Sequence, residues 1–245
     1  EARVWLKLWR AGAFSTFVAP VLMLVALGVG LGGLVDSDRQ ELEGLEYLAF
    51  VTPGLLVANA MQTAAGNSLW PVMAGHRWLG FHHAQIASPM SARDIYGGMV
   101  VWVTTKVLLQ AGVFLAAGAV IGGVSSWWGV LTIPVAGLTA AAFSAPLGAF
   151  AATQDSDAAF DVLIRVGIQP LFLFSGTLFS VDQLPAALAV LAKVFPLWHG
   201  VELARSATTG AADLVAVVGP LAVLGAYLGA GWWWGGRTFA ARLTP

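Results

Sequence analysis

Long, nearly uncharged apolar segments recur along this sequence. A helix needs about 20 apolar residues to cross the hydrocarbon core of a bilayer. Only 10% of the residues are charged and 58% are hydrophobic, whereas a soluble domain carries about 25% charged residues. So few charges leave too little polar surface to face water on every side. The sequence therefore predicts an all-α, polytopic membrane protein, and we assign residues 1–245 to a single transmembrane domain.

The apolar segments predict six membrane-spanning helices, at residues 14–35, 47–72, 95–123, 129–152, 162–179 and 214–234. Before the first of them, residues 1–12 mix Trp and Leu with Arg and Lys, a pattern typical of a helix lying in the membrane interface. Before the last of them, Pro185 and Pro196 interrupt residues 182–212. Two short apolar stretches of that kind predict a re-entrant helical pair.

The basic residues predict that both chain termini lie in the cytoplasm, because cytoplasmic loops carry an excess of Lys and Arg. This orientation places Arg39, Lys193 and Arg205 outside and Lys106 within a span. The other eight basic residues then lie on the inner side: Arg3, Lys7, Arg10, Arg77, Arg93, Arg165, Arg237 and Arg242.

Several kinds of chemistry are excluded or disfavoured by the sequence. There is no cysteine, which excludes disulfides and thiolate metal sites. No G-x-x-x-x-G-K-[ST] phosphate loop is present, so the chain lacks that means of hydrolysing a nucleotide. The net charge of -1 gives no indication of a nucleic-acid partner. We therefore expect no catalytic residue, no metal site and no cofactor bound by this chain.

Two stretches in the C-terminal third, QPLFLFSGTLFSVDQLP at 169–185 and FPLWHGVELAR at 195–205, resemble the signature of type-2 ATP-binding-cassette (ABC) exporter permeases. The amino-acid sequence of these two stretches is most similar to that of nodulation lipooligosaccharide and daunorubicin-resistance permeases. Residues 47–54 and 87–91 resemble further parts of the same permeases. The resemblance implies a cytoplasmic ABC ATPase subunit, which binds ATP and Mg, and a second permease, identical or paralogous, with a pathway between the two permeases.

The resemblance also identifies residues 74–94 as a candidate for coupling to the ATPase. We expect there a short rigid helix with Trp78, Leu79 and Phe81 on one side and His76, Arg77 and His82 on the other. An ordinary interfacial loop is the alternative.

Polar and aromatic residues in the spans are candidates for the pathway or for helix contacts. Asn59 and Gln62 share one face of the second span, where they either line a wet cavity or bond neighbouring helices. Lys106, within the third span, either snorkels or pairs with an oxygen. Phe172 and Phe174 would pack on lipid, on a subunit or on an apolar substrate.

Glu202 and Arg205 are three residues apart and have the spacing of a helical ion pair. The resemblance places them near the outer end of the pathway, so we take them as candidates for an extracellular gate.

The function implied by the resemblance is that of the permease subunit of an exporter that moves an amphipathic drug, lipid or glycolipid outward. Two other hypotheses remain open from the residues alone. One is a stand-alone ion-coupled carrier, although such carriers usually bury acids or histidines in their spans. The other is a membrane assembly protein with no transport cycle.

Overall fold

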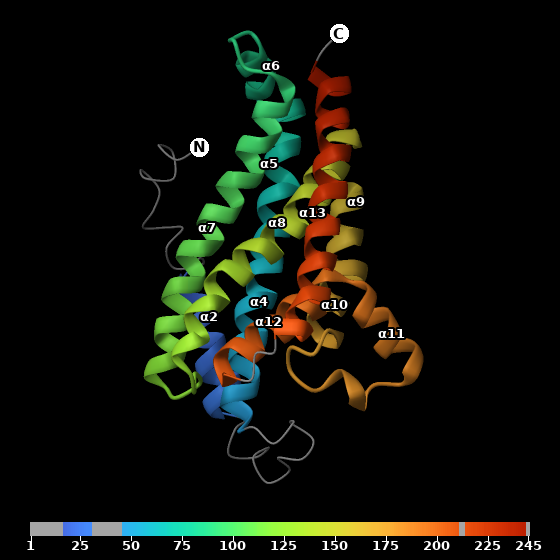
Figure 1. Ribbon diagram of the computed structural model, residues 1–245. Helices are drawn as coiled ribbons and strands as arrows, with labels where there is room; N and C mark the ends of the chain where they lie inside the picture. Colours follow the sequence, from blue (N-terminus) through green and yellow to red (C-terminus); the bar gives the residue numbers. More distant parts are fainter. Residues whose placement is uncertain (1–16, 31–45, 211–213, 244–245) are drawn as a thin grey trace.

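The computed structural model describes residues 17–30, 46–210 and 214–243 (Figure 1). Within these ranges the regular secondary structure is helical, and no strand occurs. The predicted interfacial helix at residues 1–12 lies outside the described residues. The prediction of an all-α chain is confirmed for the part of the chain that the structure describes.

Four helical runs are long and apolar enough to cross a membrane: Tyr47–Trp78, Ala92–Val120, Trp127–Thr153 and Val215–Leu243. The first run joins α4 (Tyr47–Ser68), α5 (Trp70–Met73) and the π-helix η4 (Ala74–Trp78), and the others are α7 (Ala92–Val120), the 3-10 helix η5 (Trp127–Leu131) with α8 (Thr132–Thr153), and α13 (Leu214–Leu243). The chain is thus a multi-pass membrane protein. Helix α8 packs against α4, α7 and α13.

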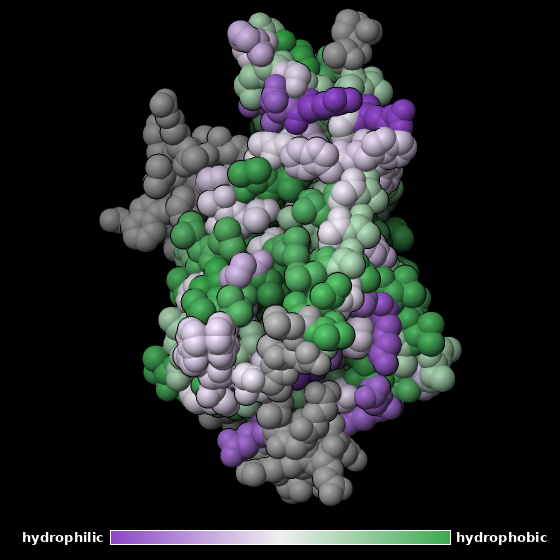
Figure 2. Space-filling view, viewed as in Figure 1, coloured by the Kyte–Doolittle hydropathy of each residue, from purple (hydrophilic) through white to green (hydrophobic). Residues whose placement is uncertain are grey.

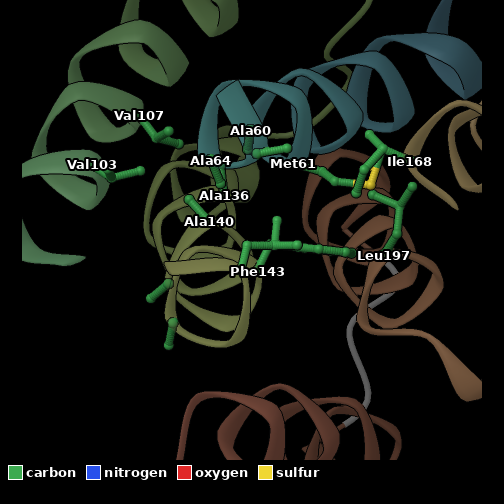
Figure 3. Packing of buried hydrophobic residues seen from close by; sticks show 14 of the residues in the cluster. Ala60, Met61, Ala64, Val103, Val107, Ala136, Ala140, Phe143, Ile168 and Leu197 are labelled. Atoms are coloured by element: carbon green, nitrogen blue, oxygen red, sulfur yellow. The ribbon is translucent and has the colours of Figure 1, made fainter. Parts of the chain in front are cut away.

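Small side chains allow α4 and α8 to approach closely. Ala60 and Ala64 on α4 and Ala136 and Ala140 on α8 are all buried, at 0–2% exposure, and they gather in one part of the core (Figure 3). In a bilayer the hydrophobic effect does not drive helices together, so close van der Waals packing of small residues takes its place. This contact sets the position of α4, which carries Asn59, Gln62, Thr63 and Asn67.

The number of spans is smaller in the described residues than the six predicted. Of the first predicted span, the structure describes residues 17–30, which contain α2 (Ala19–Leu24) and the π-helix η2 (Val25–Val29), whereas residues 14–16 and 31–35 lie outside the described residues. The fifth is a broken run of α9 (Ala158–Val162), the π-helix η6 (Leu163–Ile168) and α10 (Gln169–Phe174). The described helices therefore provide four spans, or five if a bent helix pair counts as one.

The fifth predicted span also ends earlier than residue 179. The helix stops at Phe174, and Gly176 follows with φ +79°. That left-handed conformation is open to glycine at little cost and commonly ends a helix. Hydropathy extended the span through residues 175–179 because they are apolar on average, although they form a turn.

The predicted helical pair before the last span is present. Helices α11 (Ala186–Val194) and α12 (Pro196–Thr209) meet at an angle of 85°. Phe195 between them is extended, the conformation that a following proline favours. The Tyr227 hydroxyl of α13 donates to the Val194 carbonyl at 3.2 Å. The pair lies at the end of the bundle opposite to α6 (Phe81–Ile86) (Figure 1).

Candidate functional site

The candidate coupling segment, residues 74–94, lies at one end of the bundle between the second predicted span and α7 (Figure 1). It contains η4, then Gly80 with φ +64°, then α6, and a capping box between Ser91 and Asp94 that begins α7. The short rigid helix that we expected in this segment is not formed. Gly80 separates two helical pieces, and η4 continues directly from α4 and α5.

The two expected faces of this segment are not formed as grouped, because Arg77 is exposed together with Trp78 and Leu79. His76 and His82 are buried, at 6% and 4% exposure, whereas Trp78 and Leu79 are exposed, at 55% and 75%. Arg77 is exposed as expected, and Phe81 is half-buried. The outward surface of the segment is therefore formed by Arg77, Trp78 and Leu79 rather than by the histidines.

Ring packing explains why the histidines are inside. The ring centroids of His76 and His82 are 4.7 Å apart, and that of His76 lies 5.0 Å from Phe239 of α13. A Cβ at residue 75 would lie 2.2 Å from the His82 ring, so only glycine fits there. Burial, with a smaller contribution from the nearby His83, lowers the pKa of His82 to about 4. His82 is therefore neutral at neutral pH and acts here as an aromatic core residue.

An ionic link at the same end of the bundle joins three transmembrane runs. Arg77 donates to Asp155 Oδ1 at 3.0 Å, and Arg242 of α13 donates to the same oxygen. Asp155 follows α8 in the chain. The hydrogen bond from Arg242 and the charges of both arginines hold the pKa of Asp155 below its usual value. The ends of η4, α8 and α13 are thus held together around one carboxylate.

Within the membrane-spanning part, α2, α4 and α7 enclose a polar groove of about 480 Å³. Asn59, Gln62 and Lys106 line it, as do Asn67 and Gln110. Lys106 Nζ donates to Asn67 Oδ1 at 2.5 Å, and Gln110 Nε2 donates to Asn59 Oδ1 at 2.7 Å. The amides on α4 therefore bond a neighbouring helix and line a cavity, so the two alternatives for this face are both realised.

Sequence reasoning did not single out Thr63, which completes this network. Its hydroxyl donates to Gln110 Oε1 at 2.9 Å. Threonine is common in apolar helices and often bonds its own backbone, so nothing in the sequence distinguished it. Phe172 and Phe174 do not line the groove. Phe172 is buried in the core at 7% exposure, and Phe174 is exposed at 36%.

At the opposite end of the bundle, Arg205 connects three elements. Its Nη1 donates to Glu202 at 2.9 Å, which confirms the predicted spacing of an ion pair. Its Nη2 donates to the Gly176 carbonyl at 2.7 Å, and its guanidinium lies 3.9 Å from the centre of the Phe50 ring on α4. Arg205 is itself 5% exposed. We call this arrangement the Arg205 clamp.

Close backbone approach brings the sequence stretches of the signature together at this clamp. A Cβ at Gly54 of α4 would lie 2.6 Å from the Thr177 carbonyl oxygen. A Cβ at Gly200 of α12 would lie 2.4 Å from Thr139 Oγ1. Residues 47–54, 175–177 and 200–205 are therefore in contact with one another or with α8.

Comparison with known proteins agrees with this geometry. Residues 2–208 match the family described as ABC-2 type transporter. The chain is 30% identical over 222 residues to nodulation protein J of Rhizobium leguminosarum bv. viciae, which covers 84% of this chain and 82% of the relative.

Other similar relatives are nodulation protein J of R. leguminosarum bv. trifolii, 31% identical over 89% of this chain and 83% of the relative, and that of Rhizobium meliloti, 28% identical over 92% of this chain and 82% of the relative. The resemblance noted in the sequence is confirmed. The match covers the second, third and fourth predicted spans, the coupling segment and the Arg205 clamp. The chain belongs to the ABC-2 type transporter family and is a membrane-spanning permease of an ABC transporter.

Proposed function

We propose that this permease exports an amphipathic drug, lipid or glycolipid, driven by a cytoplasmic ABC ATPase that docks on residues 74–94. The observation that carries the proposal is the placement of two specialised segments at opposite ends of the bundle (Figure 1). The polar segment at one end offers an outward surface for a motor. The bent pair α11–α12 at the other end closes over the helices.

The contacts of residues 74–94 provide a route for movement into the membrane. Arg77, Trp78 and Leu79 face outward and would touch the ATPase. Because η4 continues from α4 through α5, a push on this surface tilts the whole run Tyr47–Trp78. The rings of His76 and His82 against Phe239, together with the link through Asp155, carry the same push to α13.

At the other end, the Arg205 clamp is suited to act as the extracellular gate. It joins α12 to α4 through Phe50 and to the turn after α10 through Gly176. A tilt of α4 therefore moves groups that hold the bent pair in place. The polar groove around Asn59, Gln62 and Lys106 is a candidate surface for the polar part of a cargo.

The assembly that we propose contains two permeases, identical or paralogous, and two ATPase subunits that bind ATP and Mg. It lies in the bacterial cytoplasmic membrane with both termini of this chain in the cytoplasm. The C-terminal end of α13 contacts α6, which supports placing that terminus on the side of the ATPase.

The decisive experiment is to place a charge on the docking surface. Leu79→Asp is expected to reduce co-purification with the partner ABC ATPase, and to reduce the ATP hydrolysis of the reconstituted complex, at least about tenfold. Leu79 is 75% exposed, so the substitution should have little effect on the stability of the permease itself. Leu191→Asp on α11 is the matched control, since Leu191 is also exposed, at 53%. Equal ATPase binding by wild type and L79D would contradict the proposal.

A further inference from the structure

A second groove, between α7 and α13, is distinct from the polar groove and is not used in the proposed transport cycle. Its volume is about 990 Å³, and its lining includes Val101, Thr104, Leu228 and Gly229. This volume lies at the upper end of the range of small-molecule sites. Figure 2 shows this side of the molecule, with hydrophobic residues over the middle and a band of hydrophilic residues near the end where α7 begins and α13 ends.

Two arginines stand at that end of the groove. Arg93 of α7 lies across α13, because a Cβ at Gly236 would meet its Cγ at 3.6 Å and its Nε at 3.7 Å. Arg237 is the next residue, and its guanidinium lies 4.2 Å from the centre of the Trp233 ring. Both arginines are exposed, and no carboxylate among the described residues pairs with either. The mouth of the groove therefore carries two positive charges that pair with no acid of the part of the chain that the structure describes.

Below the two arginines, direct contacts between α7 and α13 form the base of the groove. The Tyr96 hydroxyl of α7 donates to the Gly231 carbonyl of α13 at 2.8 Å. A Cβ at Gly235 would lie 2.1 Å from the Tyr96 ring, so the two helices are in direct contact there. The groove exists because small residues of α13 bring its backbone against α7, and it does not depend on a movable side chain.

The dimensions of the groove match one leaflet of a bilayer. Along α13 it extends from Arg237 to Gly225, a rise of about 18 Å. Half of a hydrocarbon core is about 15 Å deep. Trp232 and Trp233, at 47% and 65% exposure, lie near the charged end, as expected of aromatic residues at a membrane interface.

We propose that this groove is a binding site for an anionic glycerophospholipid. The two arginines hold the phosphate of the headgroup by charge-assisted hydrogen bonds, and one acyl chain lies along the groove towards Gly225. Anionic lipids are attracted to basic pockets between transmembrane helices on the cytoplasmic side. The inference requires that the chain spans the membrane, but it does not depend on the proposed cargo or on the direction of transport.

The test uses the full chain purified in detergent and exposed to phosphatidylglycerol or phosphatidylcholine with identical acyl chains, with native mass spectrometry as the readout. We expect retained phosphatidylglycerol and little phosphatidylcholine. Arg93→Gln with Arg237→Gln is expected to weaken phosphatidylglycerol retention at least about tenfold, because two charged contacts are lost. Arg165→Gln, an exposed arginine outside the groove, is the control for loss of charge and should bind like the wild type.

A second pair of variants tests the acyl-chain part of the site. A Cβ at Gly225 or Gly229 would meet nothing within 4 Å, so Gly225→Leu with Gly229→Leu is expected to occupy the groove without displacing the backbone. This variant should fold and lose the lipid while both arginines remain. Gly219→Leu is the matched control, because Gly219 is also on α13 in open space but outside the groove.

Three outcomes would overturn the proposal. Equal retention of the two lipids would show a general lipid coat rather than a site. Unchanged phosphatidylglycerol retention in the arginine or leucine variants would remove the groove from the explanation. A shift of oligomeric mass in the leucine variant, with the lipid count unchanged, would assign the groove to a second copy of the chain.

Discussion

A single side chain, Arg205, holds α12 to two other elements of the protein. The side chain is 6% exposed in its ion pair with Glu202, while the Glu202 side chain is 36% exposed. The carboxylate thus keeps access to water, and the guanidinium does not. Because the guanidinium is planar and has five donors, it can serve the carboxylate and the Gly176 carbonyl at once. The Phe50 ring covers its face and adds a cation–π contact.

Removal of this side chain is expected to destabilise the protein. Arg205→Ala leaves the Gly176 carbonyl without its donor and should lower the free energy of unfolding by about 2–4 kcal/mol. Arg205→Lys keeps the charge but cannot serve both acceptors, so it should cost about half as much. Thermal unfolding in one detergent measures both variants.

The control for Arg205 is a pair that is exposed. Lys193 and Asp182 are 3.6 Å apart, with side chains 45% and 84% exposed. Lys193→Ala should therefore cost less than about 1 kcal/mol. If R205A and K193A unfolded at the same temperature, the Arg205 clamp would not contribute to the free energy of unfolding as we expect.

At the scale of elements, α6 is a short helix whose attachment depends on buried histidine rings. It has six residues, too few to be stable in isolation. Its contacts with the bundle include the packing of His82 against His76, Gly75 and Phe239. His82 Nδ1 has no hydrogen-bond partner in the described part of the chain. A charge on this ring would therefore be uncompensated.

Acid is expected to loosen α6. The pKa of His82 is lowered from 6.5 to about 4 by burial and by His83. The packed ring is neutral, so its contribution is complete above pH 6.5 and is lost as the pH falls towards 4. At pH 5 the loss approaches about 2 kcal/mol. Hydrogen exchange of the amides of Phe81–Ile86, corrected for intrinsic rates, should show weaker protection at pH 5 than at pH 7.

Two variants make this pH dependence specific to His82. His82→Leu removes this titrating group from the buried position, so most of the pH dependence of protection should disappear in this range. His83→Gln changes an exposed histidine and should leave most of the pH dependence in place. The explanation fails if H82L keeps the full pH dependence.

The elements also show which parts of the structure the sequence could indicate. Hydropathy placed the runs at 47–72, 95–123 and 129–152 close to their observed bounds, because length and apolar character are local properties. It could not show that the second run continues to Trp78, since that depends on packing between Gly75 and His82. The sequence also could not show which of residues 76–82 are buried, for the same reason. A histidine was counted as polar, although ring contacts from α13 bury it.

The candidate site was predictable to a similar extent. The Glu202–Arg205 pair follows from spacing within one helix, and it is present. The other partners of Arg205, Gly176 and Phe50, are separated from it by long stretches of sequence. Only the folded arrangement brings them together. The same holds for Lys106, whose partner Asn67 is on another helix.

At the scale of the whole molecule, the two ends of the bundle differ in how their basic residues are balanced. At the α6 end, Arg77 and Arg242 share one carboxylate, and Arg93 and Arg237 have none among the described residues. At the α11–α12 end, the basic residues Lys193 and Arg205 each pair with an acid. An excess of Lys and Arg residues belongs on the cytoplasmic side, and the α6 end carries these four arginines against two basic residues at the other end. The folded charges therefore favour the orientation that residue counts alone predicted, with α6 inside.

Accessibility labelling can test this orientation directly, because the chain contains no cysteine. Ala87→Cys and Ala187→Cys place one thiol beside α6 and one on α11, both at exposed alanines. A membrane-impermeant maleimide should label A187C in intact cells and A87C only after the membrane is opened. The two substitutions are equal in size and exposure class, so each is the control for the other. Labelling of A87C in intact cells would put residues 74–94 outside, where no ATP-driven subunit could reach them, and the proposed coupling would have no physical basis.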